Sequence, residues 1–224
     1  MLFNEFPINR GVRQGCPLSP ILFNLFINDI LDGCDKYGVS IGDKVCCGGL
    51  FADDIVLIAP TAKKLQLLLL CVLHWANINE MTFGIAKCST MVIKPLNYGI
   101  APDKEDPTFY FSMHAIPKVS CYTYLGIPFS DDLSLQPILS NMYIKVSKSL
   151  NSFKNFLTNN TIPIPFKKNL QSFIINKVLY YAPLLGSNKN RTSRVQSLVY
   201  KGVLWCIGSS SKDNNSKHKD KVKN

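Results

Sequence analysis

Two adjacent carboxylates are the clearest candidates for chemistry in this chain. Asp53 and Asp54 lie between two short apolar runs, residues 45–50 and 55–59. That pattern predicts a β-hairpin with the acidic pair at its tip. A carboxylate beside buried apolar segments is costly unless a metal ion or hydrogen bonds compensate. Oxygen ligands of this kind suit Mg²⁺, which usually keeps waters and substrate phosphates in its shell.

The two carboxylates are not expected to play equal parts. Consecutive side chains of an extended backbone point to opposite faces, so one Asp would be the ligand and the other would support it or face solvent. A solvated turn is the alternative, because Asp is common in turns. A second acidic pair, Asp131 and Asp132, precedes a predicted helix and is interpreted as loop and helix cap.

The elements around the hairpin are predicted from periodicity and breakers. A loop at residues 11–18 leads to a helix at 20–31, with Ser19 as cap and Pro20 at the first helical position. After the hairpin comes a helix at 62–78, which is apolar on most sides and therefore expected to be buried.

The rest of the chain divides into short strands and then helices. Further strands are expected at residues 87–93, 108–111 and 122–127, with a loop at 94–106, while Phe3, Phe6 and Ile8 have the character of strand residues. Helices are expected at 138–157, 165–181 and 195–206, and the Lys-rich tail at 209–224 is expected to be disordered. The predicted fold class is α+β, with residues 1–130 mixed and residues 131–208 helical.

Composition points to a polyanionic partner. The 224 residues carry a net charge of +10, 46% are hydrophobic and 18% are charged, so a real core is possible and overall disorder is not expected. Nucleic acid is the leading candidate, because Lys and Arg bind phosphates. A merely basic surface is the alternative.

The eight cysteines form no C-x-x-C pair and no His cluster accompanies them, which argues against zinc. We interpret the thiols as reduced and the compartment as intracellular. Residues 1–10 have no signal-peptide pattern, and no apolar run approaches the roughly 20 residues of a membrane span, so no membrane partner is expected.

Four motifs in order resemble those of non-LTR (LINE-type) retrotransposon reverse transcriptases. Residues 13–20, RQGCPLSP, followed by ILFN, resemble the motif B loop and helix, and residues 51–54, FADD, resemble motif C. Trp75 with residues 84–89, GIAKCS, is similar to motif D, and residues 122–127, YTYLGI, resemble the primer-grip motif E. Motifs B and C together are specific, whereas D and E alone are weak.

The resemblance implies a partial polymerase palm at residues 1–130, an antiparallel sheet with helices, followed by an α-helical thumb at 131–208. The implied activity is RNA-directed DNA polymerisation with two Mg²⁺ ions, acting on an RNA template, a DNA primer and dNTP. Asp53 would be a metal ligand with Asp54 in support, and Lys87 would lie near the triphosphate and protonate the leaving pyrophosphate.

Binding roles follow from the same resemblance. Template or nucleotide contacts are implied for Arg13, Gln14 and Gly15. Phe51 would pack under the primer end. Primer positioning is implied for Tyr124, Leu125 and Gly126. Each also has an ordinary interpretation, as surface charge, turn glycine, solvated lysine or core.

Six lysines of the predicted helical region also have two interpretations. They are either ordinary charges of amphipathic helices or a track for a phosphate backbone. The set is Lys145, Lys148, Lys154, Lys167, Lys168 and Lys177.

The chain departs from the family at one point. Motif A, which supplies an essential Asp on a neighbouring strand, lies upstream of motif B in the family, and this chain begins just before B. Neither Glu5 nor Asp29 has the strand context to replace it. We therefore expect a polymerase fragment that needs a fingers and motif A segment, is poorly soluble or inactive alone, and acts in the nucleus. A catalytically dead nucleic-acid-binding remnant is the alternative.

Overall fold

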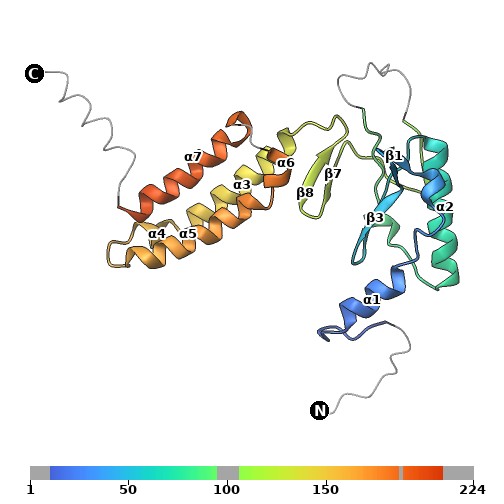
Figure 1. Ribbon diagram of the computed structural model, residues 1–224, viewed down its shortest axis with the longest axis horizontal. Coiled ribbons are helices and arrows are strands. Elements are labelled where there is room, and N and C mark those ends of the chain that lie inside the picture. Colours follow the sequence, from blue (N-terminus) through green and yellow to red (C-terminus); the bar gives the residue numbers. More distant parts are fainter. Residues whose placement is uncertain (1–10, 95–105, 187–188, 209–224) are drawn as a thin grey trace, which may run out of the picture. The chain divides into compact units, whose positions relative to one another are not determined.

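The computed structural model describes residues 11–94, 106–186 and 189–208. The expected strand residues Phe3, Phe6 and Ile8, most of the loop at 94–106 and the tail at 209–224 lie outside the described residues. The chain divides into two compact units, Met1–Val92 with Ala101–Val119 and Ile93–Ile100 with Ser120–Asn224. Helices and small antiparallel sheets occur together (Figure 1), so the α+β class is confirmed.

The described part of the first unit combines two α-helices and two 3-10 turns with three hairpins. Its elements are α1 (Ser19–Ile27), the 3-10 turn η1 (Asp35–Tyr37), β1 (Val39–Ile41), β2 (Lys44–Cys46), β3 (Gly48–Phe51), β4 (Asp54–Leu57), α2 (Ala62–Ile78), η2 (Ile85–Lys87), β5 (Tyr110–Phe111) and β6 (His114–Ala115). Strands pair in order, β1 with β2, β3 with β4 and β5 with β6, and each of these described sheets has two strands.

Helix α2 has the bounds that the sequence predicts, and its start has a clear cause. Thr61 is extended, and its hydroxyl oxygen accepts a hydrogen bond from the Lys64 amide at 3.3 Å, which is the geometry of an N-cap. One face packs into the core through Leu68, Leu69, Val72 and Ala76. Burial on most sides was wrong, because the side chains of Leu70 and Ile78 are exposed.

Three predictions for this unit were wrong in detail. Helix α1 ends at Ile27, four residues short of the expected position. The strand expected at 87–93 is replaced by η2 and a single parallel bridge between Thr90 and Lys118. The hairpin of β1 and β2 was not predicted. Its second strand, β2, includes the first residues of the apolar run at 45–50, which was assigned to the acidic hairpin.

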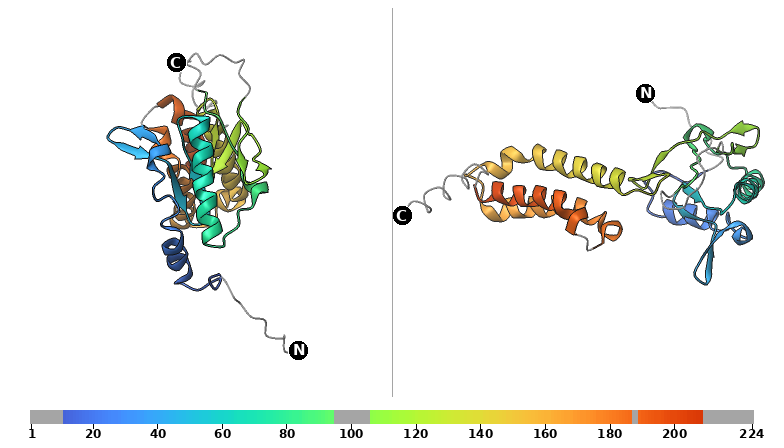
Figure 2. Two further views of the ribbon diagram at one scale, coloured as in Figure 1. Left: turned by 90° about the vertical axis from the view of Figure 1, so that its right-hand side faces the viewer. Right: turned by 90° about the horizontal axis from the view of Figure 1, so that it is seen from above.

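The second unit is a β-hairpin followed by a helical bundle. Its elements are β7 (Cys121–Tyr124), β8 (Ile127–Ser130), α3 (Gln136–Ser152), α4 (Lys154–Thr158), α5 (Ile164–Leu179), α6 (Ala182–Leu185) and α7 (Lys189–Cys206). The single strand predicted at 122–127 was wrong, because Leu125 and Gly126 form a tight turn between two strands. Figure 2 shows α3, α5 and α7 running side by side, and all three contact one another.

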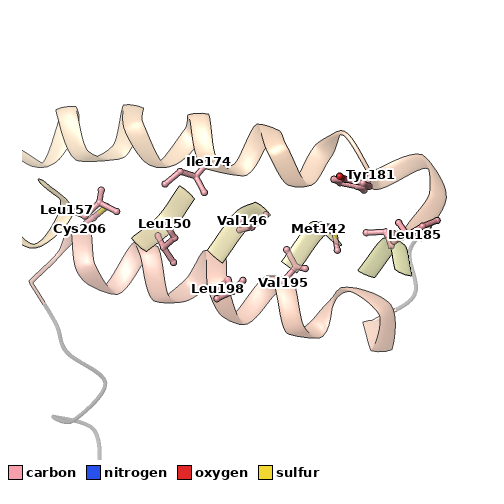
Figure 3. Packing of buried hydrophobic residues seen from close by; sticks show 11 residues of the cluster. Met142, Val146, Leu150, Leu157, Ile174, Tyr181, Leu185, Val195, Leu198 and Cys206 are labelled. Atoms are coloured by element: carbon pink, nitrogen blue, oxygen red, sulfur yellow. The ribbon is translucent and has the colours of Figure 1, made fainter. Parts of the chain in front are cut away.

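The bundle core is built from regularly spaced apolar side chains. On α3, Ile138, Met142, Val146 and Leu150 recur every four residues and are all buried. Figure 3 shows such side chains from several helices filling the space between them. Gly202 on α7 lets the helices approach closely, since a Cβ there would lie 3.0 Å from Leu150 Cδ1.

None of the helices in the described part of the chain has the length and apolar character of a membrane-spanning segment.

Candidate functional site

The Asp pair lies at the tip of a hairpin, as predicted. Strands β3 and β4 pair from Gly48 opposite Leu57 to Phe51 opposite Asp54, which leaves Ala52 and Asp53 as a two-residue turn. Ala52 has φ +50°, the left-handed conformation that such turns require. Both carboxylates are exposed. The hairpin therefore presents two acidic groups to solvent on adjacent residues.

The base of this hairpin is fixed while its tip is free. Leu50, Ile55 and Leu57 are partly buried against a core that includes Leu69 and Phe111. The ladder continues past the strands, where the Ile58 amide donates to the Cys47 carbonyl at 2.8 Å. Because strand side chains alternate, Asp54 and Val56 share the face opposite Ile55 and Leu57. The core thus fixes the direction in which Asp54 projects.

Helix α2 is tied to the neighbouring β5 by one amide side chain. Gln66 Nε2 donates to the Tyr110 carbonyl at 2.8 Å, and the Tyr110 amide donates to Gln66 Oε1 at 3.0 Å. A glutamine that pairs with both backbone groups of one residue acts like an added strand residue. This contact adds rigidity to the core that supports the acidic hairpin.

The loop before α1 is folded by its own hydrogen bonds. The Cys16 amide donates to the Arg13 carbonyl at 3.3 Å, so Gln14 and Gly15 occupy the centre of a turn. Gly15 has φ +81°, which its missing Cβ permits. Ser19 lies inside the helix, and its hydroxyl donates to the Arg13 carbonyl at 2.6 Å. The Ser19 side chain therefore closes the loop through this hydrogen bond, and the prediction that it caps α1 was wrong.

Other predicted residues of this unit are accessible but not gathered by any described contact. Arg13, Gln14, Gly15 and Lys87 are exposed, and Phe51 is 62% exposed beside the acidic pair. Lys87 ends η2, where its amide donates to the Gly84 carbonyl at 2.8 Å. In the part of the chain that the structure describes, no contact links these side chains to Asp53.

Trp75 serves a structural purpose that the sequence did not indicate. Its indole Nε1–H donates to Asp29 Oδ1 at 2.8 Å, and its ring meets Phe26 edge-on with centroids 5.6 Å apart. These contacts hold α1 and the turn after it against α2. Apolar side chains of α1 and of its N-cap are nevertheless exposed, at Leu18, Ile21, Leu22 and Leu25.

The turn between β7 and β8 is the second place where predicted site residues meet. Leu125 and Gly126 have φ +48° and +76°. The left-handed conformation costs a residue with a Cβ about 1 kcal/mol or more, so surrounding contacts must hold Leu125 in place. Tyr124 precedes the turn and is partly buried.

Those contacts come from the helices. The Gly126 carbonyl oxygen accepts from Lys145 Nζ at 3.1 Å, Asn141 Nδ2 at 3.2 Å and the Tyr181 hydroxyl at 3.3 Å. The Tyr180 hydroxyl donates to the Leu125 carbonyl. Both carbonyls of the turn are therefore bound by side chains from α3 and from the end of α5.

The lysine track is contradicted at one position. Lys167 is only 3% exposed, and its Nζ donates to the Cys206 carbonyl at 3.4 Å, so it lies inside the bundle. Lys145 is bound to Gly126, and Lys177 Nζ donates to the Ser149 hydroxyl at 2.6 Å. Lys154 lies over the Trp205 ring at 5.8 Å. The other five lysines of the set, Lys145, Lys148, Lys154, Lys168 and Lys177, are all exposed.

The other acidic pair has a local structural role. Asp132 Oδ1 accepts from the Ser134 amide at 2.8 Å and from the Ser130 hydroxyl. The Ser130 hydroxyl, followed by the Ser134 amide, lowers the pKa of Asp132 below its ordinary value of 3.8. The loop interpretation is confirmed, but the cap is not, because α3 has Leu135 at its N-cap and no side-chain capping bond.

Asp53 and Asp54 can supply some of the ligands that a magnesium ion needs. Mg²⁺ is commonly bound through one or two carboxylates together with waters and substrate phosphates. Asp53 and Asp54 can supply that number of carboxylates. Across the described residues, no group of three or more His, Cys, Asp or Glu side chains gathers. The described residues thus offer two adjacent carboxylates for a metal ion and not a complete ligand set.

All eight cysteines are free thiols. Cys34 and Cys47 are buried near Cys71. Burial, followed by the neighbouring Cys71 and Cys47, raises the pKa of the Cys34 thiol to about 11. A thiol with so high a pKa is a poor nucleophile near neutral pH, so Cys34 is a packing residue.

Comparison with known proteins assigns the family. Residues 2–129 match the family described as reverse transcriptase (RNA-dependent DNA polymerase). The match covers more than half of the chain, including the Gly15 loop and the acidic hairpin. This chain belongs to the reverse transcriptase family.

Three of the proteins similar to this chain are Pol polyproteins of R2-type retrotransposable elements. A Retrovirus-related Pol polyprotein from the type-2 retrotransposable element R2DM of Drosophila melanogaster is 37% identical over 130 residues, 56% of this chain and 12% of that protein. The type-1 element R2 of Popillia japonica encodes a Pol polyprotein 26% identical over 145 residues, 62% of this chain and 24% of that protein. A third, from R2 of Nasonia vitripennis, is 36% identical over 87 residues, 38% of this chain and 8% of that protein. The chain spans at most a quarter of each of these three relatives.

Proposed function

We propose that this chain is part of an RNA-directed DNA polymerase of a non-LTR retrotransposon, with Asp53 and Asp54 as its metal-binding carboxylates. The observation that carries the proposal is the anchored hairpin, which presents the exposed Asp pair within the segment that matches the reverse transcriptase family. The R2-type Pol polyproteins among its relatives support the retrotransposon origin. The expected substrates are an RNA template, a DNA primer and dNTP.

The chain's own residues would act on either side of the reacting phosphate. Mg²⁺, when bound, stabilises the charge that develops as the nucleotidyl group is transferred. Phe51, exposed next to the acidic pair, offers an apolar surface on which the primer end can pack. Lys87, exposed at the end of η2, is a donor for the leaving pyrophosphate.

Template and nucleotide contacts are proposed for the loop before α1. Its turn leaves Arg13, Gln14 and Gly15 exposed, and Gly15 has no Cβ to keep a nucleotide from the backbone. Guanidinium and amide groups are suited to phosphate and base edges. The turn of Leu125 and Gly126, with Tyr124, is proposed to position the primer.

The reaction needs more carboxylate ligands than the described residues gather. We propose that a further Asp comes from a polymerase segment outside this chain. The large share of each relative that this chain does not cover is compatible with that arrangement. Action on chromosomal DNA would require a nuclear location.

A second function is favoured by the same incomplete ligand set. The chain would bind nucleic acid through its basic surface without performing chemistry. The net charge of +10 supports such binding whether or not catalysis is retained. The two functions differ in one outcome, the extension of a primer.

Primer extension on a primed RNA template with Mg²⁺ tests the proposal. The purified chain is assayed alone and together with a separately produced fragment that carries the fingers and the motif A Asp. Asp53→Ala is compared with Asp43→Ala, because Asp43 is also the exposed second residue of a two-residue hairpin turn, between β1 and β2.

The expected result is extension that requires the added fragment, is abolished by Asp53→Ala and is unchanged by Asp43→Ala. Salt-sensitive binding without extension in any mixture would replace the polymerase by the binding function. Absence of both binding and extension would exclude the two functions together.

A further inference from the structure

The Gly126 carbonyl oxygen is saturated by side chains of the bundle. A carbonyl oxygen has two lone pairs, and this one accepts from Lys145, Asn141 and Tyr181 at 3.1–3.3 Å. Two of these donors, Lys145 and Asn141, lie one helical turn apart on α3, so they reach the same point. The carbonyl is therefore occupied by the protein and has no capacity left for nucleic acid.

The ammonium of Lys145 is also committed. Besides Gly126 it donates to the Tyr181 hydroxyl at 3.0 Å, and it lies 5.7 Å from the centre of the Tyr181 ring. The Asn141 amide donates to the same hydroxyl at 3.3 Å. Tyr181 is only 2% exposed, so the hydroxyl that joins these groups has a fixed position. Lys145 is exposed, but two of its three ammonium hydrogens are directed at protein oxygens, which orients the side chain toward the turn.

The neighbouring residue completes the arrangement. The Tyr180 hydroxyl donates to the Leu125 carbonyl, and its ring meets that of Tyr181 edge-on with centroids 5.3 Å apart. Leu125 is held at φ +48°, a conformation that a leucine adopts rarely. The strained residue and the four donors around it lie at one place, where the hairpin meets the helices.

We propose that Lys145, Asn141 and Tyr181 are positioning residues that set the Leu125–Gly126 turn for the primer. We define these three residues as the turn clamp. Lys145 acts on the primer through Gly126 and makes no phosphate contact of its own. This inference rests on the proposed function, because it assumes that the turn meets the primer.

Because the turn clamp comes from α3 and from the end of α5, the conformation of the turn depends on the positions of these two helices. A charge-assisted hydrogen bond is stronger and shorter than a neutral one, so removal of the Lys145 charge should loosen the turn more than removal of an ordinary surface charge. Lys148, three residues later on the same helix, is exposed and provides the matched control. Tyr143, exposed on α3, is the control for Tyr181.

The test uses the whole chain and a primer–template duplex with 2-aminopurine at the primer 3′ end. Lys145→Met, Lys148→Met, Tyr181→Phe and Tyr143→Phe are compared with the unmodified chain, and Lys145→Arg is the rescue variant. Three quantities are measured: the fluorescence of the 3′-end probe, the slope of log affinity against log salt, and amide hydrogen exchange of residues 124–127.

The expected result separates positioning from phosphate binding. Lys145→Met and Tyr181→Phe should speed exchange at residues 124–127 about tenfold, the factor for a lost charge-assisted bond, and change the probe signal. The salt slope should stay as it is for the unmodified chain. Lys148→Met and Tyr143→Phe should leave exchange and probe signal unchanged, and Lys145→Arg should restore both.

Two outcomes would overturn the inference alone. One is a salt slope reduced by about one in Lys145→Met with unchanged exchange, which would make Lys145 a phosphate ligand. The other is an unchanged probe signal and unchanged exchange in Lys145→Met and Tyr181→Phe. Failure of the unmodified chain to bind the duplex would overturn the proposed function, and this inference with it.

Discussion

The ammonium of Lys167 donates to the carbonyl oxygen of Cys206 over 3.4 Å, across two helices of the bundle. Cys206 is the last residue of α7, where unpaired carbonyls carry partial negative charge that favours a cation. Gln171, one turn later on α5, donates to the Val199 carbonyl at 2.9 Å and accepts from the Cys206 thiol at 3.1 Å. Together the two polar side chains fix α5 against the end of α7.

Reversal of the Lys167 charge should strongly destabilise the bundle. Lys167→Glu buries a carboxylate beside the negative end of α7 and is expected to lower the free energy of unfolding by about 3 kcal/mol or more. Lys168→Glu, on the adjacent exposed position, should change it by about 0.5 kcal/mol at most. Urea unfolding followed by circular dichroism measures both, and equal losses in the two variants would contradict the buried placement.

Gly202 is predicted to be intolerant of a larger side chain. A Cβ there would lie 3.0 Å from Leu150 Cδ1 and 3.1 Å from Gln171 Nε2, so Gly202→Val overpacks the contact of three helices. The expected loss is about 1–3 kcal/mol of unfolding free energy. Val203→Ala, at the exposed neighbouring residue, is the control. An unchanged unfolding midpoint for Gly202→Val would show that the helices are farther apart.

The thiols should differ widely in reactivity. Cys34 is buried, and its pKa of about 11 lies two units above the ordinary 9.0, so its thiolate fraction at pH 8 is reduced about a hundredfold. Cys121 is exposed. Brief alkylation with iodoacetamide, followed by peptide mass spectrometry, should modify Cys121 early and Cys34 only after denaturation. Early modification of Cys34 in the native chain would refute its burial.

Asp132 should contribute to stability with a defined pH dependence. Its pKa is lowered in the folded chain, below 3.8, by the Ser130 hydroxyl and the Ser134 amide. The folded state therefore binds this proton less readily than the unfolded state, and the contribution is present above pH 3.8 and lost as the pH falls through the lowered value. Between pH 5 and pH 3, Asp132→Asn should lose stability less steeply than the unmodified chain. The same steepness in both would mean that the loop does not favour the carboxylate.

The sequence predicted the elements that local signals specify. Helix α2 was predicted at its observed bounds because the apolar run at 62–78 marks it clearly. The acidic hairpin was predicted because two apolar runs flank a polar centre. Both features depend on residues close in sequence, so no tertiary information was needed.

The errors arose where tertiary contacts decide. The strand at 122–127 was predicted as continuous because Leu125 gives no sign of a turn. Its positive φ is held by the Tyr180 hydroxyl and the Asn141 side-chain amide, which are distant in sequence. Gly126 was the one residue of this segment whose type indicated a turn. Burial of Lys167 was equally hidden, since a lysine on an amphipathic helix is ordinarily exposed.

Metal rescue at Asp53 tests whether this carboxylate is a ligand of the catalytic metal ion. In the two-fragment primer-extension assay, Asp53→Cys replaces an oxygen ligand by sulfur, which binds Mg²⁺ poorly and softer metals such as Mn²⁺ better. Extension by Asp53→Cys should fall to background in Mg²⁺ and partly return when Mn²⁺ is added, while Asp43→Cys should extend normally in both. Full activity of Asp53→Cys in Mg²⁺, or equal loss in the two variants, would contradict the assignment of Asp53 as a metal ligand.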